Sequence, residues 1–144
     1  MSYANPSDMA ARFPNRDLVQ ITNEDPTVTT VNNAALTTAL ADASAEIDAF
    51  LGARFTLPLA DPPAMLNRIA IDIAMYRLQT LRPLADVAEA RRRFEDAIVR
   101  LMKIAAGQLT LGPAPDGADA PISAGAQTIV GARRVFSRRR LRGF

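Results

Sequence analysis

The chain has 144 residues, 49% of them hydrophobic and 22% charged, so its size and composition are those of one globular domain. It has no cysteine and no histidine, which removes disulfides, thiolate metal ligands and the commonest general base. No apolar run approaches the ~20 residues that span a bilayer and no signal peptide is recognisable, so we expect a cytoplasmic protein without membrane contact, metal, cofactor or catalytic residues.

The first helix is expected directly after Asn5. Asn5 can cap it, Pro6 suits its first turn, and Asp8 is favoured near the positive end of the helix dipole. Pro14 ends this short helix and can begin a second one. The polar stretch TNEDPTVTTVNN then predicts a loop.

Three longer helices follow, because apolar residues recur at helical spacing over residues 33–51, 63–81 and 86–106. The segment 63–81 is apolar on most sides and is therefore expected at the centre of a bundle. Gly107 is expected to end the last helix.

The connection between the first two long helices has a different pattern. Residues 53–59 alternate between polar and apolar side chains, as in an extended segment with one buried side. Gly52 marks the start of this connection. Asp61, which two prolines follow, is expected to cap the next helix.

Beyond Gly107 the composition changes to glycine, proline, alanine and aspartate, and no helical period continues. The chain is therefore predicted to be mainly α, with a small bundle of about four to five helices over residues 1–107. A Gly/Pro/Ala-rich linker at 108–127 and an arginine-rich docking segment at 128–144 follow, so that the bundle carries a long extended C-terminal arm.

Positive charge is concentrated at the end of the chain, since residues 133–144 hold six arginines and no acid, whereas residues 1–132 hold 11 basic and 15 acidic residues. Apolar side chains interrupt the arginines, which favours docking on a partner over a solvated tail. Arginine pairs with phosphates and with carboxylates, so DNA and an acidic protein surface both stay open as partners. The predicted docking residues are Arg133, Arg134, Val135, Phe136, Arg138, Arg139, Arg140, Leu141, Arg142 and Phe144.

Charged residues of the bundle indicate structural roles. Glu46 and Asp48 are two residues apart on a helix, so they point in different directions and cannot act together as a carboxylate dyad. Arg68 and Asp72 are four residues apart on the most apolar helix, and we expect them to pair either in the core or at a subunit interface.

Five stretches stand out along the chain: MSYANPSDMAARF, RDLVQITN, ALADASAEIDAFLGARFTLPL, PPAMLNRIAIDIAMYRL and RRRFEDAIVRLMKIAAGQLTLG. Together they resemble the Mu-like phage head-to-tail adaptor family. The resemblance covers roughly residues 1–112, and its most specific part is the helix followed by ARFTLPL. The segment from residue 113 onward carries no motif of the family.

This resemblance implies a non-catalytic virion protein that binds the portal protein and joins the DNA-filled head to the next neck or tail-completion protein. Such adaptors usually form a ring of twelve subunits around the channel through which double-stranded DNA passes. The chain is therefore expected in the phage neck and, during assembly, in the host cytoplasm. The resemblance makes Arg54, Phe55, Leu57 and Pro58 a hinge or subunit contact. For residues 128–144, the interleaved arginines and apolar side chains predict docking on the portal, a neighbouring subunit or DNA.

A second class of function is a small DNA-binding or regulatory protein whose arginine-rich tail binds phosphates. It fits less well, because a reader of DNA carries its positive charge on a rigid helix, whereas here the bundle is net acidic and the arginines follow a linker. An enzyme would need carboxylates that converge from distant parts of the chain.

Overall fold

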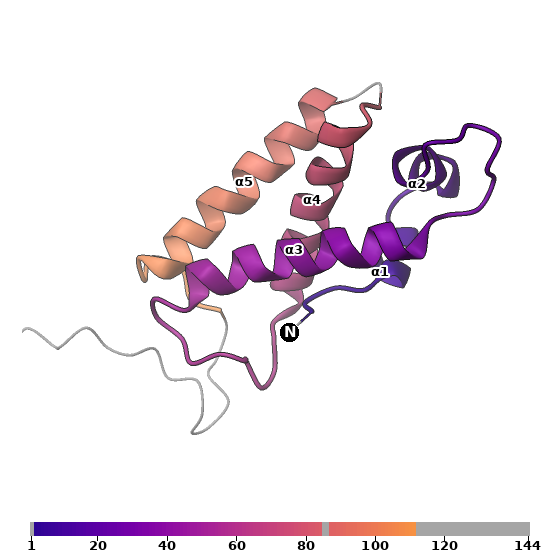
Figure 1. Ribbon diagram of the computed structural model, residues 1–144. Coiled ribbons are helices and arrows are strands. Elements are labelled where there is room, and N and C mark those ends of the chain that lie inside the picture. The colour runs from indigo at the N-terminus through magenta and orange to yellow at the C-terminus, as the bar shows by residue number, and fades with distance from the viewer. Residues whose placement is uncertain (1, 85–86, 112–144) are drawn as a thin grey trace, which may run out of the picture.

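The computed structural model describes residues 2–84 and 87–111, and all regular secondary structure within them is helical (Figure 1). The described helices are α1 (Pro6–Ala10), α2 (Asn15–Thr22), α3 (Asn33–Leu51), α4 (Ala64–Leu81) and α5 (Val87–Ala105). The prediction of a mainly α bundle is confirmed, and the three long helices keep their expected bounds to within one residue. The arginine-rich arm and the linker beyond residue 111 lie outside the described residues.

Side-chain caps explain where α1 and α3 begin. The side chain of Asn5 accepts a hydrogen bond from the backbone N–H of Asp8 at 3.1 Å, and the Asp8 carboxylate accepts one from the backbone N–H of Asn5 at 2.9 Å. At α3, the side chain of Asn32 accepts from the backbone N–H groups of Ala34 and Ala35. These bonds satisfy donors that have no partner inside the helix.

By contrast, α2 and α4 each begin directly after a proline. Pro14 and Pro63 hold the N-cap positions, and neither helix has a side-chain cap hydrogen bond. The prediction that Asp61 caps α4 is therefore wrong. Pro63, with its fixed φ of −59°, occupies the cap position and sets the start of the helix at Ala64.

Helix α4 lies at the centre of the bundle, as its apolar sequence predicted. It packs against α3 and α5, and α3 crosses the α4–α5 pair (Figure 1). Leu66, Ile69 and Ile73 of α4 are fully buried, and they share one core with Ile47 of α3 and Leu101 of α5. Full burial of such a side chain contributes ~1.5–3 kcal/mol, so this common core holds the three long helices together.

Tyr3 fixes the segment before α1 to the bundle. Its backbone N–H donates to the hydroxyl of Ser44 in α3, and its carbonyl accepts from Nδ2 of Asn67 in α4, both at 3.2 Å. Its hydroxyl donates to the carboxylate of Asp48, and burial together with this contact raises the pKa of Tyr3. Asp48 thus has a structural partner at the N-terminus of the chain.

Candidate functional site

The predicted docking residues of the arm lie outside the described residues. They are Arg133, Arg134, Val135, Phe136, Arg138, Arg139, Arg140, Leu141, Arg142 and Phe144. Their partner therefore stays a prediction, whereas the structure places the remaining candidates in the bundle.

Arg54 lies at the end of the bundle where α3 and α5 both stop. Its Nη1 donates a hydrogen bond to the backbone carbonyl of Ile104 at 3.2 Å, and its guanidinium lies 5.8 Å from the centre of the Phe55 ring. Gly107, which follows α5 with a φ of +76°, approaches the same guanidinium so closely that a Cβ there would lie 2.6 Å from Nη1. Arg54 thus binds the C-terminal end of α5 within its own chain, and its role as a hinge or subunit contact stays a prediction.

The segment after Arg54 packs in the alternating way that its sequence predicted. Phe55 and Leu59 are buried, Leu57 is partly buried against the core, and Pro58 is exposed. The backbone forms turns and bends instead of a regular extended strand, and the Leu57–Pro58 peptide is cis. Of these residues, only exposed Pro58 lies fully on the surface for a subunit contact.

Arg68 and Asp72 form an ion pair on α4, with Nε of Arg68 3.9 Å from a carboxylate oxygen of Asp72. The Arg68 side chain is 65% exposed, so the pair does not lie in the core of this chain, and an interface stays the remaining prediction. Asp72 is mostly covered, and burial raises the pKa of its carboxyl group. Nearby arginines act in the opposite direction; they are Arg68, Arg93, Arg12 and Arg100.

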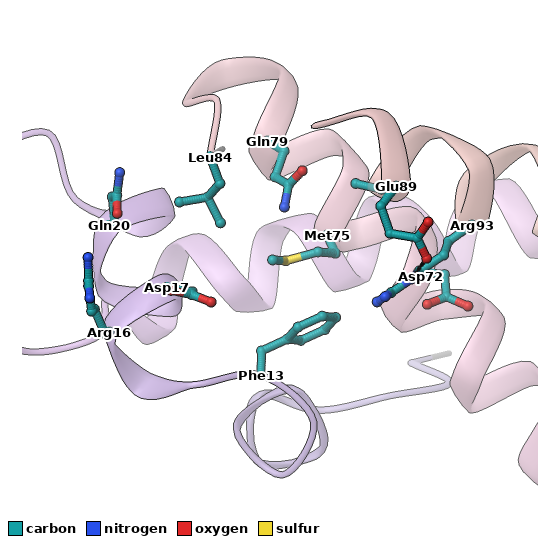
Figure 2. A pocket seen from close by; sticks show the side chains of 11 residues that line it. Phe13, Arg16, Asp17, Gln20, Asp72, Met75, Gln79, Leu84, Glu89 and Arg93 are labelled. Atoms are coloured by element: carbon teal, nitrogen blue, oxygen red, sulfur yellow. Dashed lines mark hydrogen bonds and ion pairs between the residues drawn. The ribbon is translucent and has the colours of Figure 1, made fainter. Parts of the chain in front are cut away.

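Asp72 also lines a hollow that sequence reasoning missed. The hollow has a volume of about 450 Å³ and lies between α2, the second half of α4 and the start of α5 (Figure 2). Figure 2 shows Gln79 pointing into it above Met75 and Phe13. The full lining is Phe13, Arg16, Asp17, Gln20, Asp72, Met75, Gln79, Leu84, Glu89, Ala90 and Arg93.

Gln79 is the unusual member of this lining. It is only 5% exposed, and its Oε1 atom has no hydrogen-bond partner within the described part of the chain. An unsatisfied buried acceptor costs ~1–3 kcal/mol. The one signal in the sequence is its spacing from Met75, since a glutamine four residues on from a buried methionine falls on the same buried face of the helix.

The described residues contain neither a cluster of metal-ligating side chains nor a membrane-spanning helix. In residues 2–84 and 87–111, no three acidic side chains gather closely enough to hold a metal ion. No helix among these residues has both the length and the hydropathy to cross a bilayer. Three large apolar side chains are exposed on the described surface, namely Leu81, Val99 and Met102.

Comparison with known proteins places the sequence in a family. The family model described as Bacteriophage Mu, Gp36 matches residues 3–130 of this chain. The chain belongs to the phage Mu Gp36 family. This Gp36-family chain is 35% identical to the Mu-like prophage FluMu protein gp36 of Haemophilus influenzae over 142 residues, which cover 99% of this chain and 97% of the relative.

A second relative is gene product J of Escherichia phage Mu. It is 35% identical to this Gp36-family chain over 92 residues, which are 64% of this chain and 65% of the relative. The resemblance to Mu-like phage proteins is thus confirmed at the level of the family.

Proposed function

We propose that this Gp36-family protein is a structural adaptor of the phage neck. It binds the portal protein and joins the DNA-filled head to the next neck or tail-completion protein, as a ring of subunits around the DNA channel. The observation that carries this proposal is membership of a phage Mu family across residues 3–130, which includes the whole helical bundle.

The distribution of charge and apolar surface supports a binding role. The last helix ends at Ala105, Leu109 and Leu111 still pack on the core, and the sequence beyond them finishes with six arginines interleaved with apolar residues. On the bundle, Val99 and Met102 of α5 are 48% and 54% exposed, and they offer an apolar contact for a neighbouring subunit. In a closed ring, each such modest contact is repeated at every interface and stabilises the whole assembly.

The test is binding of two forms of the protein to the cognate portal ring. One form is the full-length chain and the other ends at Leu111, which keeps the core contacts of Leu109 and Leu111, with duplex DNA titrated in parallel over a range of salt concentrations. We expect the full-length chain to decorate the portal and the shortened chain to bind far more weakly, because the proposed adaptor needs the arginine-rich arm to assemble as a ring on the portal.

A third form separates docking from charge alone. It replaces Val135, Phe136, Leu141 and Phe144 with serine and keeps all six arginines of the arm. We expect this form to bind the portal weakly, as the shortened chain does. Binding of the full-length chain to duplex but not to portal, with a steep dependence on salt, would replace the adaptor with the DNA-binding alternative.

A further inference from the structure

A second hollow adjoins the one beside Gln79. The second hollow has a volume of about 610 Å³, and the two share Arg16 and Gln20 as lining residues. Its remaining lining comes from α2, the loop after it, and the end of α4 with the two residues that follow: Val19, Asn23, Glu24, Asp25, Pro26, Val28, Leu81, Arg82 and Pro83. Together the two hollows form one surface feature, here called the α2–α4 groove.

Two side chains of this groove lack the environment that they require. Gln79, 5% exposed, turns its side chain into the hollow (Figure 2), and its buried Oε1 has no donor among the described residues. A peptide backbone carries both N–H and C=O groups, so it can pair with this amide in either orientation. Leu81, at the other end of the groove, is 75% exposed, so a ligand with an apolar side chain would cover it. Both needs are met by a peptide segment that carries apolar side chains.

The charge of the groove indicates which peptide would bind. Its lining holds three guanidinium groups and five carboxylates, of which Asp17, Glu24 and Asp25 come from α2 and the following loop. The charges within the pairs Arg93–Glu89 and Arg82–Glu24, at 3.0 and 2.8 Å, cancel each other, and Asp72 pairs with Arg68. Asp17 and Asp25 then remain against Arg16. A basic segment therefore fits this groove better than an acidic one.

The chain itself contains a segment with these properties. Residues 133–144 read RRVFSRRRLRGF, which combines six arginines with four large apolar side chains and no acid. The chain continues for 33 residues beyond Leu111, enough for a reach on the order of 110 Å when extended. Leu109 and Leu111 pack on the core after the end of α5, about 28 Å by helix length from the groove at its start.

We propose that the α2–α4 groove binds residues 133–144 of a second copy of the chain. The described residues end at Leu111, just after the last turn of α5, whereas the groove lies at the start of α5. Each subunit therefore offers an arm at one end and a groove at the other. Such a contact is heterologous, and when its rotation closes it generates a ring. The inference rests on one part of the proposed function, namely that the adaptor forms a ring. It does not depend on binding to the portal.

The experiment uses the full-length chain, which has no natural cysteine. Gln20→Cys places a thiol on the exposed rim of the groove, and Ser137→Cys places one in the middle of the arm segment. Under mild oxidation the double variant is expected to form disulfide-linked multimers, because docking holds the two thiols at high effective concentration. Disulfides within single chains only, or no cross-linking above the control below, would overturn the proposal.

A matched control moves the first thiol to another surface. Thr38→Cys lies on the exposed side of α3, away from the groove, and is combined with the same Ser137→Cys. We expect this pair to cross-link about tenfold more slowly than the groove pair. Equal rates would mean that the arm collides with the whole surface and has no docking site.

Gln79→Leu tests the proposed contact directly. Added to the groove pair, it should slow cross-linking about three- to tenfold, because the backbone of the arm loses its amide partner. A purely structural role predicts no change in cross-linking. If Gln79→Leu fails to fold, charge reversal by Asp17→Arg with Glu24→Arg gives a second test, since Asp17 is partly exposed and Glu24 is exposed. Portal binding by these variants is scored separately, so failure of this contact and failure of the adaptor proposal are distinguishable.

Discussion

Arg54 is the residue for which a structural and an assembly role make opposite predictions. Its hydrogen bond to the Ile104 carbonyl joins segments 50 residues apart, and a charged donor in such a bond is worth about 1.5–3 kcal/mol. Because Arg54 keeps part of its surface in water, we expect Arg54→Ala to lower the free energy of unfolding by about 1–2 kcal/mol. Urea denaturation followed by circular dichroism measures this loss.

A suitable control is Arg92→Ala, since Arg92 is an exposed arginine of α5. We expect that change to alter stability by no more than about 0.5 kcal/mol. If Arg54→Ala behaves like Arg92→Ala in unfolding but weakens subunit association, the contact with α5 is unimportant and the hinge or subunit role is correct.

Asp72 gives stability a specific dependence on pH. Burial raises the pKa of its carboxyl group above the ordinary value of 3.8, and the arginines around it offset this effect only in part. The folded chain therefore holds the Asp72 proton more tightly than the unfolded chain. Protonated Asp72 makes its full contribution to the free energy of unfolding below pH 3.8, and this contribution is lost as the pH rises through the raised pKa.

Asp72→Asn removes this dependence, because an amide stays neutral. Relative to the unsubstituted chain, we expect the variant to gain free energy of unfolding between about pH 3 and about pH 7. Urea denaturation of both proteins at the two pH values isolates the residue, since the other titrating groups are common to both. If the free energy of unfolding of the variant instead falls relative to the unsubstituted chain as the pH rises, the arginines around Asp72 outweigh its burial.

At the scale of elements, Gly107 and Arg54 together form the end of α5. Gly107→Ala places a side chain at a φ of +76°, which costs roughly 1–2 kcal/mol, and sets its Cβ 3.0 Å from Cζ of Arg54. Moving the guanidinium away would relieve the clash but weaken the bond to Ile104. We therefore expect a double-mutant cycle to be non-additive, with Gly107→Ala less harmful in an Arg54→Ala background. Additive losses would mean that the two residues act independently.

The long helices were predictable because each signal is local in the sequence. Apolar spacing and the caps at Asn5 and Gly107 depend only on neighbouring residues, and the structure bears them out. The prediction for Asp61 was wrong because two preferences compete at Asp-Pro-Pro: aspartate favours the N-cap, and proline favours the first turn. In the structure the helix starts later, and Pro63 holds the cap position. The contact between Arg54 and Ile104 could not be predicted, since it depends on the angles at which α3, α4 and α5 pack.

At the scale of the whole molecule, the groove shows why a binding site is harder to infer than a fold. Its lining comes from α2, α4 and α5, and no one of these segments carries a motif for it. Gln79 and Leu81 are separated by one residue, yet one is buried and the other exposed, because they lie on different sides of α4. Only the assembled bundle brings Gln79 and Leu81 into the linings of two adjoining hollows.

The proposed division between bundle and arm predicts the behaviour of a chain that ends at Leu111. The described core runs from Tyr3 to Ile104, so we expect this shortened chain to unfold cooperatively, with a free energy of unfolding within about 0.5 kcal/mol of the full-length chain when both are dilute. Circular dichroism with urea measures the unfolding, and analytical ultracentrifugation over a range of concentrations measures association.

Association should respond differently from folding, because the groove of each shortened subunit receives no arm from its neighbour. The sedimentation coefficient of the full-length chain is expected to rise with concentration, while that of the shortened chain stays at the monomer value. If removal of the arm instead destabilises the dilute monomer by several kcal/mol, the segment beyond residue 111 completes the fold of its own chain. If both chains associate equally, the arm is not the contact between subunits. The exposed side chains Val99 and Met102 of α5 would then be the surface that joins subunits in the ring.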